Sequence, residues 1–162
     1  MDHQKSGKMF KQMAGIELVH VPYKGTSQLL PDLLAGRVPM AIDSLPAHLP
    51  HLKTGKVRVL AVASPARTAT LPDIPTMSEA GLPGFVVTQW HGLTAPRGTP
   101  TAIVSRVEGW LNQEVRTPET KEFLNRNGAE PFPSSGKAMG DMTVVEIKKW
   151  GEVVRAVDLK AE

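Results

Sequence analysis

The sequence has no cysteine, which excludes disulfides, thiolate metal sites and cysteine nucleophiles from its 162 residues. Aromatic residues make up only 5% of the chain. The 19 basic residues exceed the 16 acidic ones by three and do not gather into a run. A surface that stacks bases or follows a phosphate backbone needs aromatic or clustered basic residues, so we expect no nucleic-acid partner.

Long apolar runs are also missing. No stretch approaches the roughly 18 apolar residues that a membrane-spanning helix needs. The first residues, MDHQKSGKMFKQMAG, lack the apolar middle of a signal peptide, so this chain is expected to carry no export signal. Two common catalytic motifs do not occur either, the Gly-x-Ser-x-Gly elbow and the phosphate-binding Gly-x-x-x-x-Gly-Lys loop.

The first 84 residues alternate between extended and helical patterns. Strands are predicted at residues 16–21, 38–43 and 56–64, where apolar side chains alternate or form a short run. Helices are predicted at residues 8–14, from Thr26 or Ser27 to about residue 35, and from residue 45 to 53, each followed by a glycine. In the second of these helices, Pro31 is compatible only with the first turn. Strand, helix, strand, helix, strand predicts right-handed crossovers and a parallel sheet.

The second half of the chain is predicted to be helical. Residues 65–84 form a proline-rich loop with one short helix, in which Thr76 and Glu79 have the spacing of a capping box. An extended segment from residue 85 then crosses between two lobes. Helices are expected to begin with Thr99-Pro100, with Thr117-Pro118 and near residue 137. The last of them carries an apolar stripe formed by Ile147, Trp150, Val154 and Val157.

The candidate site lies in the loops that follow the first two predicted strands. Because the carboxyl ends of parallel strands meet at one edge of a sheet, both loops are expected to face the same cleft. Asp43 is an acceptor either for a ligand or for helix N–H groups, and Lys24 is either a charge for a ligand carboxylate or a solvated lysine. Trp90 is either a pocket wall or a core anchor. The candidate ligand-binding residues are Tyr23, Lys24, Gly25, Thr26, Asp43, Ser44 and Trp90.

Two other kinds of chemistry are considered at the same place. His48 and His51 lie three residues apart on one predicted helix, a spacing that can place two imidazoles on one metal ion, but no third ligand accompanies them. We therefore expect neither a metal nor another cofactor. Ser44 with Asp43 and His48 leaves a small serine hydrolase as a remote alternative, since neighbours in sequence rarely form a catalytic triad.

Several long motifs, in order, resemble one family. FKQMAGIELVHVPYKG, DLLAGRVPMAIDSLPAHLPHLKTGKVRVLAV, LPDIPTMSEAGLPGF and WHGLTAPRGTP are similar to segments of the Bug-type solute-binding receptors of tripartite tricarboxylate transporters. The resemblance implies an α/β fold of the type II periplasmic-binding-protein class, with two lobes that close on a small organic acid. It also implies a periplasmic receptor rather than an enzyme. The implied ligand is a di- or tricarboxylate or an aromatic acid, and the implied partners are membrane transporter subunits.

The resemblance covers only the C-terminal portion of such a receptor. It assigns residues 1–84 to most of the second lobe, and residues 85–162 to the crossing segment and the C-terminal helices of an incomplete first lobe. We therefore expect a truncated receptor with weak carboxylate binding. Apolar helix faces without a sheet to cover are expected to drive homo-oligomerisation through the C-terminal helices. The alternative is a ligand-incompetent oligomeric interaction module.

Overall fold

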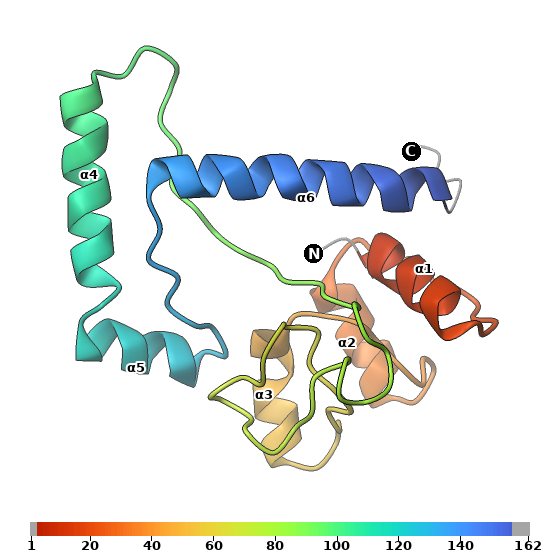
Figure 1. Cartoon of the computed structure of the whole chain (residues 1–162). Helices are drawn as coiled ribbons and strands as arrows, with labels where there is room; N and C mark the ends of the chain where they lie inside the picture. The colour runs from red at the N-terminus through yellow and green to blue at the C-terminus, as the bar shows by residue number, and fades with distance from the viewer. Residues whose placement is uncertain (1–2, 157–162) are drawn as a thin grey trace. The chain divides into compact units, whose positions relative to one another are not determined.

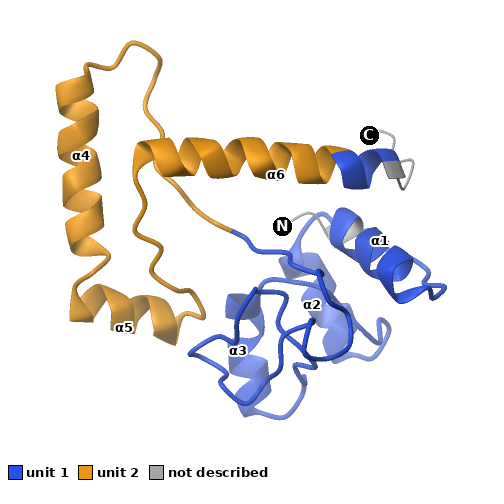
Figure 2. Ribbon diagram, viewed as in Figure 1, with its two compact units in different colours: residues 1–89, 152–162 blue, residues 90–151 orange. Residues whose placement is uncertain are grey.

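The computed structural model describes residues 3–156 and contains six helices in that range. In chain order they are α1 (His3–Ala14), α2 (Thr26–Leu34), α3 (Leu45–Lys53), α4 (Thr101–Glu114), α5 (Pro118–Arg126) and α6 (Gly136–Ala156) (Figure 1). The chain forms two compact units (Figure 2). Unit 1 contains the chain up to Gln89 together with the end of α6 from Glu152, and unit 2 is Trp90–Gly151.

The helices of unit 1 follow the sequence pattern. α2 and α3 begin and end within a residue or so of the predicted positions, and α1 begins earlier than expected, at His3. Gly36 and Gly55 follow α2 and α3 with φ angles of 72° and 68°, a left-handed conformation that ends a helix at little cost only in glycine. These glycines therefore fix where the chain leaves each helix.

Pro31 does not lie where the sequence predicted. It is the sixth residue of α2, beyond the first turn, and the helix continues through it to Leu34. A proline at this position has no N–H to donate to the carbonyl of Ser27, and its ring crowds the preceding turn. The expectation of a first-turn proline was wrong because α2 already starts at Thr26.

The predicted parallel sheet is not formed in residues 3–156. Residues 16–21 and 40–43 join no strand ladder within that range, Val38 and Pro39 lie in a bend, and Val19 is 93% exposed. Around Val62 the third predicted strand makes one isolated parallel bridge with Thr76, and the Ala63 carbonyl accepts a hydrogen bond from Val87 N at 2.8 Å. Alternation of apolar residues predicts an extended chain, but a strand also needs a neighbouring strand to pair its backbone groups.

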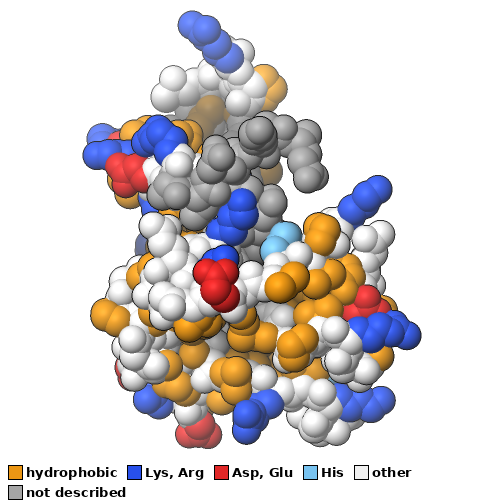
Figure 3. Space-filling model, turned by 90° about the vertical axis from the view of Figure 1, so that its right-hand side faces the viewer, with side chains coloured by type: hydrophobic (Ala, Val, Ile, Leu, Met, Phe, Trp, Pro, Cys, Tyr) orange, Lys and Arg blue, Asp and Glu red, His pale blue; other side chains and the backbone are white. Residues whose placement is uncertain are grey.

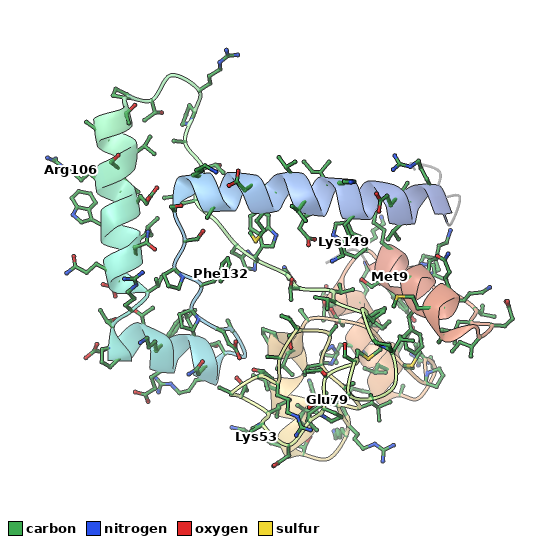
Figure 4. The ribbon with its side chains drawn as sticks, viewed as in Figure 1. Met9, Lys53, Glu79, Arg106, Phe132 and Lys149 are labelled. Atoms are coloured by element: carbon green, nitrogen blue, oxygen red, sulfur yellow. The ribbon has the colours of Figure 1, made fainter. Side chains whose placement is uncertain are left out.

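The core of unit 1 is small and joins distant parts of the chain. Its buried hydrophobic residues are Met9 on α1, Leu29 on α2, and Phe85 and Val87 in the segment before unit 2. Phe10 meets Phe85 edge to face, with ring centroids 5.8 Å apart. Figure 4 labels Met9 on the helix that supplies this contact. The packing of aromatic edge on face ties α1 to residues 85–87.

The predicted capping box is present, although it closes a turn rather than a helix. Thr76 N donates to Glu79 Oε2 at 2.7 Å, and Glu79 N donates back to Thr76 Oγ1 at 3.1 Å. Arg67 Nε lies 3.0 Å from Glu79 Oε2 (Glu79 is labelled in Figure 4). These hydrogen bonds from Thr76 and Arg67 lower the pKa of the Glu79 carboxyl. The proline-rich loop is therefore held by local polar contacts.

Unit 2 contains α4, α5 and most of α6. Thr117 caps α5 as predicted, since its side chain accepts from Thr120 N. Thr99 does not cap α4, because Pro100 occupies that position and the Thr99 hydroxyl donates to the carbonyl of Pro96. Glu108 on α4 accepts from Gly136 N at 2.8 Å, which connects α4 to the start of α6.

No residue of unit 2, residues 90–151, is buried. Phe132, in the connection between α5 and α6, is 66% exposed (Figure 4). In the view of Figure 3, hydrophobic side chains gather on the lower part of the molecular face. No described helix is long and apolar enough to cross a membrane. The large exposed hydrophobic residues of unit 2 are Trp90, Leu93, Ile103, Val104, Trp110, Leu111, Phe123, Phe132, Val144, Val145 and Ile147.

Candidate functional site

The first loop of the candidate site is braced by Tyr23. Its hydroxyl donates to Asp32 Oδ2 on α2 at 2.7 Å, and Arg37 Nη1 contacts the other carboxylate oxygen at 2.6 Å. The hydrogen bond to Asp32 raises the pKa of Tyr23, and the hydrogen bonds from Tyr23 and then Arg37 lower the pKa of Asp32. Tyr23 therefore fixes the loop against α2 through an ionised acceptor.

Lys24, Gly25 and Thr26 form the entrance to α2. The backbone N–H of Lys24 donates to Gln28 Oε1 at 3.3 Å, and its ammonium group has no ion-pair partner among residues 3–156. Gly25 precedes α2 with extended φ and ψ angles of 169° and 172°, and no side chain caps the helix there. The first turn of α2 carries no acidic residue. The N-terminus of a helix is a favourable place for an anion, and this one has a lysine beside it.

Asp43 connects the second loop to the first. Its Oδ1 accepts from Thr26 Oγ1 at 2.8 Å and from Ser44 N at 2.7 Å. Its Oδ2 lies 2.9 Å from Nε2 of His48, the fourth residue of α3. The Asp43 side chain is only 2% exposed. A buried carboxylate is stable only when donors surround it, and here the donors come from the entrances of both helices.

The structure thus brings together part of the predicted site. Thr26 and Asp43 are in direct contact, Ser44 is the N-cap residue of α3, and Tyr23 is bonded to α2. Trp90 belongs to unit 2, whereas the other predicted site residues belong to unit 1. Asp43 accepts from one backbone N–H at the start of α3, that of Ser44, and it also contacts the side chains of Thr26 and His48.

His48 and Asp32 are the residues that sequence reasoning did not place in the site. His48 was considered only as a metal ligand or as part of a hydrolase triad, and Asp32 was not considered. The signal for His48 was its place five residues after Asp43, across a helix start, where side chains can meet in the first turn. The signal for Asp32 was weaker, because its nine-residue separation from Tyr23 spans a loop.

The contacts of His48 also bear on the metal and hydrolase alternatives. Among the described residues, no group of three or more His, Cys, Asp or Glu side chains could hold a metal ion. A hydrolase triad needs the imidazole between the serine and the aspartate. Here Nε2 contacts Asp43, and Nδ1 is buried without a hydrogen-bond partner, so Ser44 is not bonded to the ring.

Residues 3–159 match the family described as tripartite tricarboxylate transporter family receptor. The chain belongs to this receptor family. The resemblance inferred from the sequence is thereby confirmed. A protein from the tcbD-tcbE intergenic region of a Pseudomonas species is 38% identical over 91% of this chain and 44% of its own length. One from the clcB-clcD region of Pseudomonas knackmussii is 37% identical, over 87% of this chain and 84% of its own length. BugT of Bordetella pertussis is 32% identical over 94% of this chain and 47% of its own length.

Solved structures of these receptors share the fold. An R. palustris protein solved with adipate aligns with 38% identity and a TM-score of 0.86, over 96% of this chain and 52% of its own. The periplasmic binding protein BugD aligns with 31% identity and a TM-score of 0.80, over 99% of this chain and 55% of its own. MatC of Rhodopseudomonas palustris, solved with bound malate, aligns with 31% identity and a TM-score of 0.78, over 94% of this chain and 53% of its own. The chain therefore has the fold of about half of a periplasmic binding protein of this family, and it spans about half the length of most of these relatives.

Proposed function

We propose that this chain is a solute-binding receptor, or a truncated form of one, that captures a small organic carboxylate for a tripartite tricarboxylate transporter. The family match over residues 3–159 carries the proposal. The two related structures with ligands hold adipate and malate, and both are small dicarboxylates. On this proposal the chain is periplasmic, is not an enzyme and takes membrane transporter subunits as partners. It also self-associates through its C-terminal helices.

The proposed ligand site is the entrance to α2. Lys24 supplies the positive charge, and the N–H groups around Gly25 and Thr26 supply donors to one carboxylate of the ligand. The Lys24 ammonium group, which has no ion-pair partner among residues 3–156, and the helix start without a side-chain cap support this placement. Ser44 lies beside it at the start of α3.

A titration of the isotope-labelled chain with adipate and malate, followed by NMR, tests this function. One lobe supplies about half of the contacts of a closed receptor. Halving a micromolar binding free energy of about −8.2 kcal/mol leaves about −4.1, so we expect millimolar dissociation constants and amide shifts centred on residues 24–28. Lys24→Gln should weaken binding about two- to fivefold, as expected for an exposed ion pair worth up to about 1 kcal/mol.

Two controls accompany the titration. Lys53→Gln changes an exposed lysine at the far end of α3 (labelled in Figure 4) and should leave the affinity unchanged. Dimethyl adipate, which has the same chain without charges, should not bind. Saturable shifts from the diester, or equal losses from both lysine variants, would show that the site is not a carboxylate site.

The alternative is a ligand-incompetent interaction module. It is favoured by the complete lack of buried residues in unit 2, which leaves its helix faces available for other contacts. Absence of any amide shift with adipate, malate or an aromatic acid at tens of millimolar would select this alternative.

A further inference from the structure

The Asp43 carboxylate is held by hydrogen bonds from within the protein. Both of its oxygens accept hydrogen bonds, from Thr26, from Ser44 N and from His48, at 2.7 to 2.9 Å. Its side chain is 2% exposed. A buried aspartate would also repel a carboxylate ligand if its charge were not compensated by these donors. Asp43 therefore connects the start of α2 to the start of α3.

His48 is the most constrained member of this group. Its side chain is 9% exposed, Nε2 contacts Asp43 and Nδ1 is buried without a partner. An ionised carboxylate only accepts hydrogen bonds, so the contact places a proton on Nε2. The hydrogen bond from Nε2 to Asp43 is therefore the polar contact that the structure gives this side chain.

We propose that His48 is a positioning residue of the carboxylate site, which acts through Asp43 to lock the N-terminus of α2 to that of α3. This inference rests on the proposed function for its ligand readout, but the lock itself exists without a ligand. The link runs from the fourth residue of α3 to Asp43 Oδ2, and from Asp43 Oδ1 to the first residue of α2, Thr26. Loss of the imidazole removes one hydrogen-bond donor from the buried carboxylate of Asp43, so the carboxylate reorients toward its remaining donors and its contact with Thr26 changes.

The first readout needs no ligand. NMR of the imidazole nitrogens should show a proton on Nε2 of His48 that is shared with Asp43 in the full chain. His48→Leu should then shift the amide resonances of residues 25–28, which follow the hydroxyl contact of Thr26. His48→Gln places an amide N–H where Nε2 donates and should restore the native shifts. Thr26→Val, which removes only the hydroxyl, should produce the reciprocal shift at Ser44 and the first turn of α3.

The second readout is adipate affinity in the same variants. His48→Leu should weaken binding about tenfold, the loss expected for a hydrogen bond to a charged group, and His48→Gln should recover most of it. His51→Leu is the matched control: it removes a half-buried imidazole from the same helix, and its side chain has no contact with Asp43. It should change neither the amide shifts of residues 25–28 nor the affinity.

The outcomes separate the two proposals. Native amide shifts in His48→Leu, a Gln variant that behaves like the Leu variant, or an imidazole without a proton on Nε2 would overturn the positioning role. If His48→Leu fails to fold, the Nε2 proton and the Gln variant still decide. If the native chain binds no carboxylate while the amide shifts follow the predicted pattern, the proposed function fails and the lock between α2 and α3 stands.

Discussion

At the scale of single residues, the site depends on acceptors that serve the protein. Tyr23 is the one tyrosine of the chain, and its hydroxyl donates to Asp32, which also accepts from Arg37. The folded state raises the pKa of Tyr23 and lowers that of Asp32. The Tyr23 contribution to stability is therefore present below about pH 10 and is lost as the pH rises through its folded-state pKa. The Asp32 contribution is present above about pH 4 and is lost as the pH falls through its own lowered pKa.

Because there is one tyrosine, its titration can be followed directly by ultraviolet difference spectroscopy. In the native chain the phenol should titrate above its ordinary value of about 10. Asp32→Ala removes the acceptor and the negative charge, so the Tyr23 pKa should fall back to about the ordinary value. Asp73→Ala, at an exposed aspartate of the proline-rich loop, is the control and should leave the titration unchanged. A Tyr23 pKa that does not respond to Asp32→Ala would show that this hydrogen bond does not brace the loop in solution.

At the scale of elements, α2 and α3 each contain an interior proline, Pro31 and Pro50, and α3 also has Pro46 in its first turn. Pro31 is the sixth residue of α2, where it removes a backbone hydrogen bond, and Pro46 is the second residue of α3, where a helix needs no donor. Both side chains are exposed, so neither packs in the core. Pro31 is therefore a local weakness in the helix that begins at the proposed site.

Pro31→Ala should raise the free energy of unfolding by about 1–3 kcal/mol, because the alanine N–H can reach the Ser27 carbonyl and the ring no longer crowds the turn. Denaturant unfolding measures the change. Pro46→Ala is the matched control and should lower stability by about 0.4–1 kcal/mol or leave it unchanged, because a compatible proline restricts the unfolded chain. Equal effects of the two substitutions would contradict the assignment of Pro31 to the helix interior.

At the scale of the whole molecule, unit 2 has helices but no core. Along α4 the exposed fractions are 54% for Ile103, 39% for Val104, 62% for Trp110 and 43% for Leu111. A shallow hollow beside Trp110 is lined by Leu111, Gln113 and Glu114. Trp150, from the predicted stripe on α6, is half-buried and its indole N–H donates to Glu146 Oε2 at 2.7 Å, while Val157 lies outside the described residues. α4 therefore carries an exposed apolar face, and α6 adds the exposed Val144, Val145 and Ile147.

We expect the chain to form a homodimer or larger species through this face. Burial of a large apolar side chain is worth about 1.5–3 kcal/mol, and a symmetric contact counts each side chain twice. Arg106, which projects from α4 (Figure 4), and Glu114 each lie four residues from Trp110, so antiparallel α4 helices centred on Trp110 also pair opposite charges. Trp110→Glu should weaken self-association at least tenfold in light scattering, whereas Ser105→Glu, at an exposed polar position of the same helix, should have little effect. A monomer at high concentration in the native chain would contradict this expectation.

The sequence by itself determined most of the helices, several of their ends and the family. Glycines after α2 and α3, the Thr117 cap and the capping-box pair Thr76–Glu79 act within a few residues, so their contacts follow from local spacing. The family followed from long motifs in a fixed order and was confirmed over residues 3–159. These features need no knowledge of what lies elsewhere in the chain.

Only the tertiary structure decided which polar groups meet and which extended segments pair. The contact of Thr26 with Asp43 spans 17 residues, and that of Tyr23 with Asp32 spans nine across a loop. Spacing cannot predict such contacts because several loop conformations satisfy the same local pattern. The predicted strands failed to form ladders for the same reason: alternation is local, whereas a ladder needs a partner in register. Burial of Asp43, and with it the role of His48, became visible once α2 and α3 were placed together.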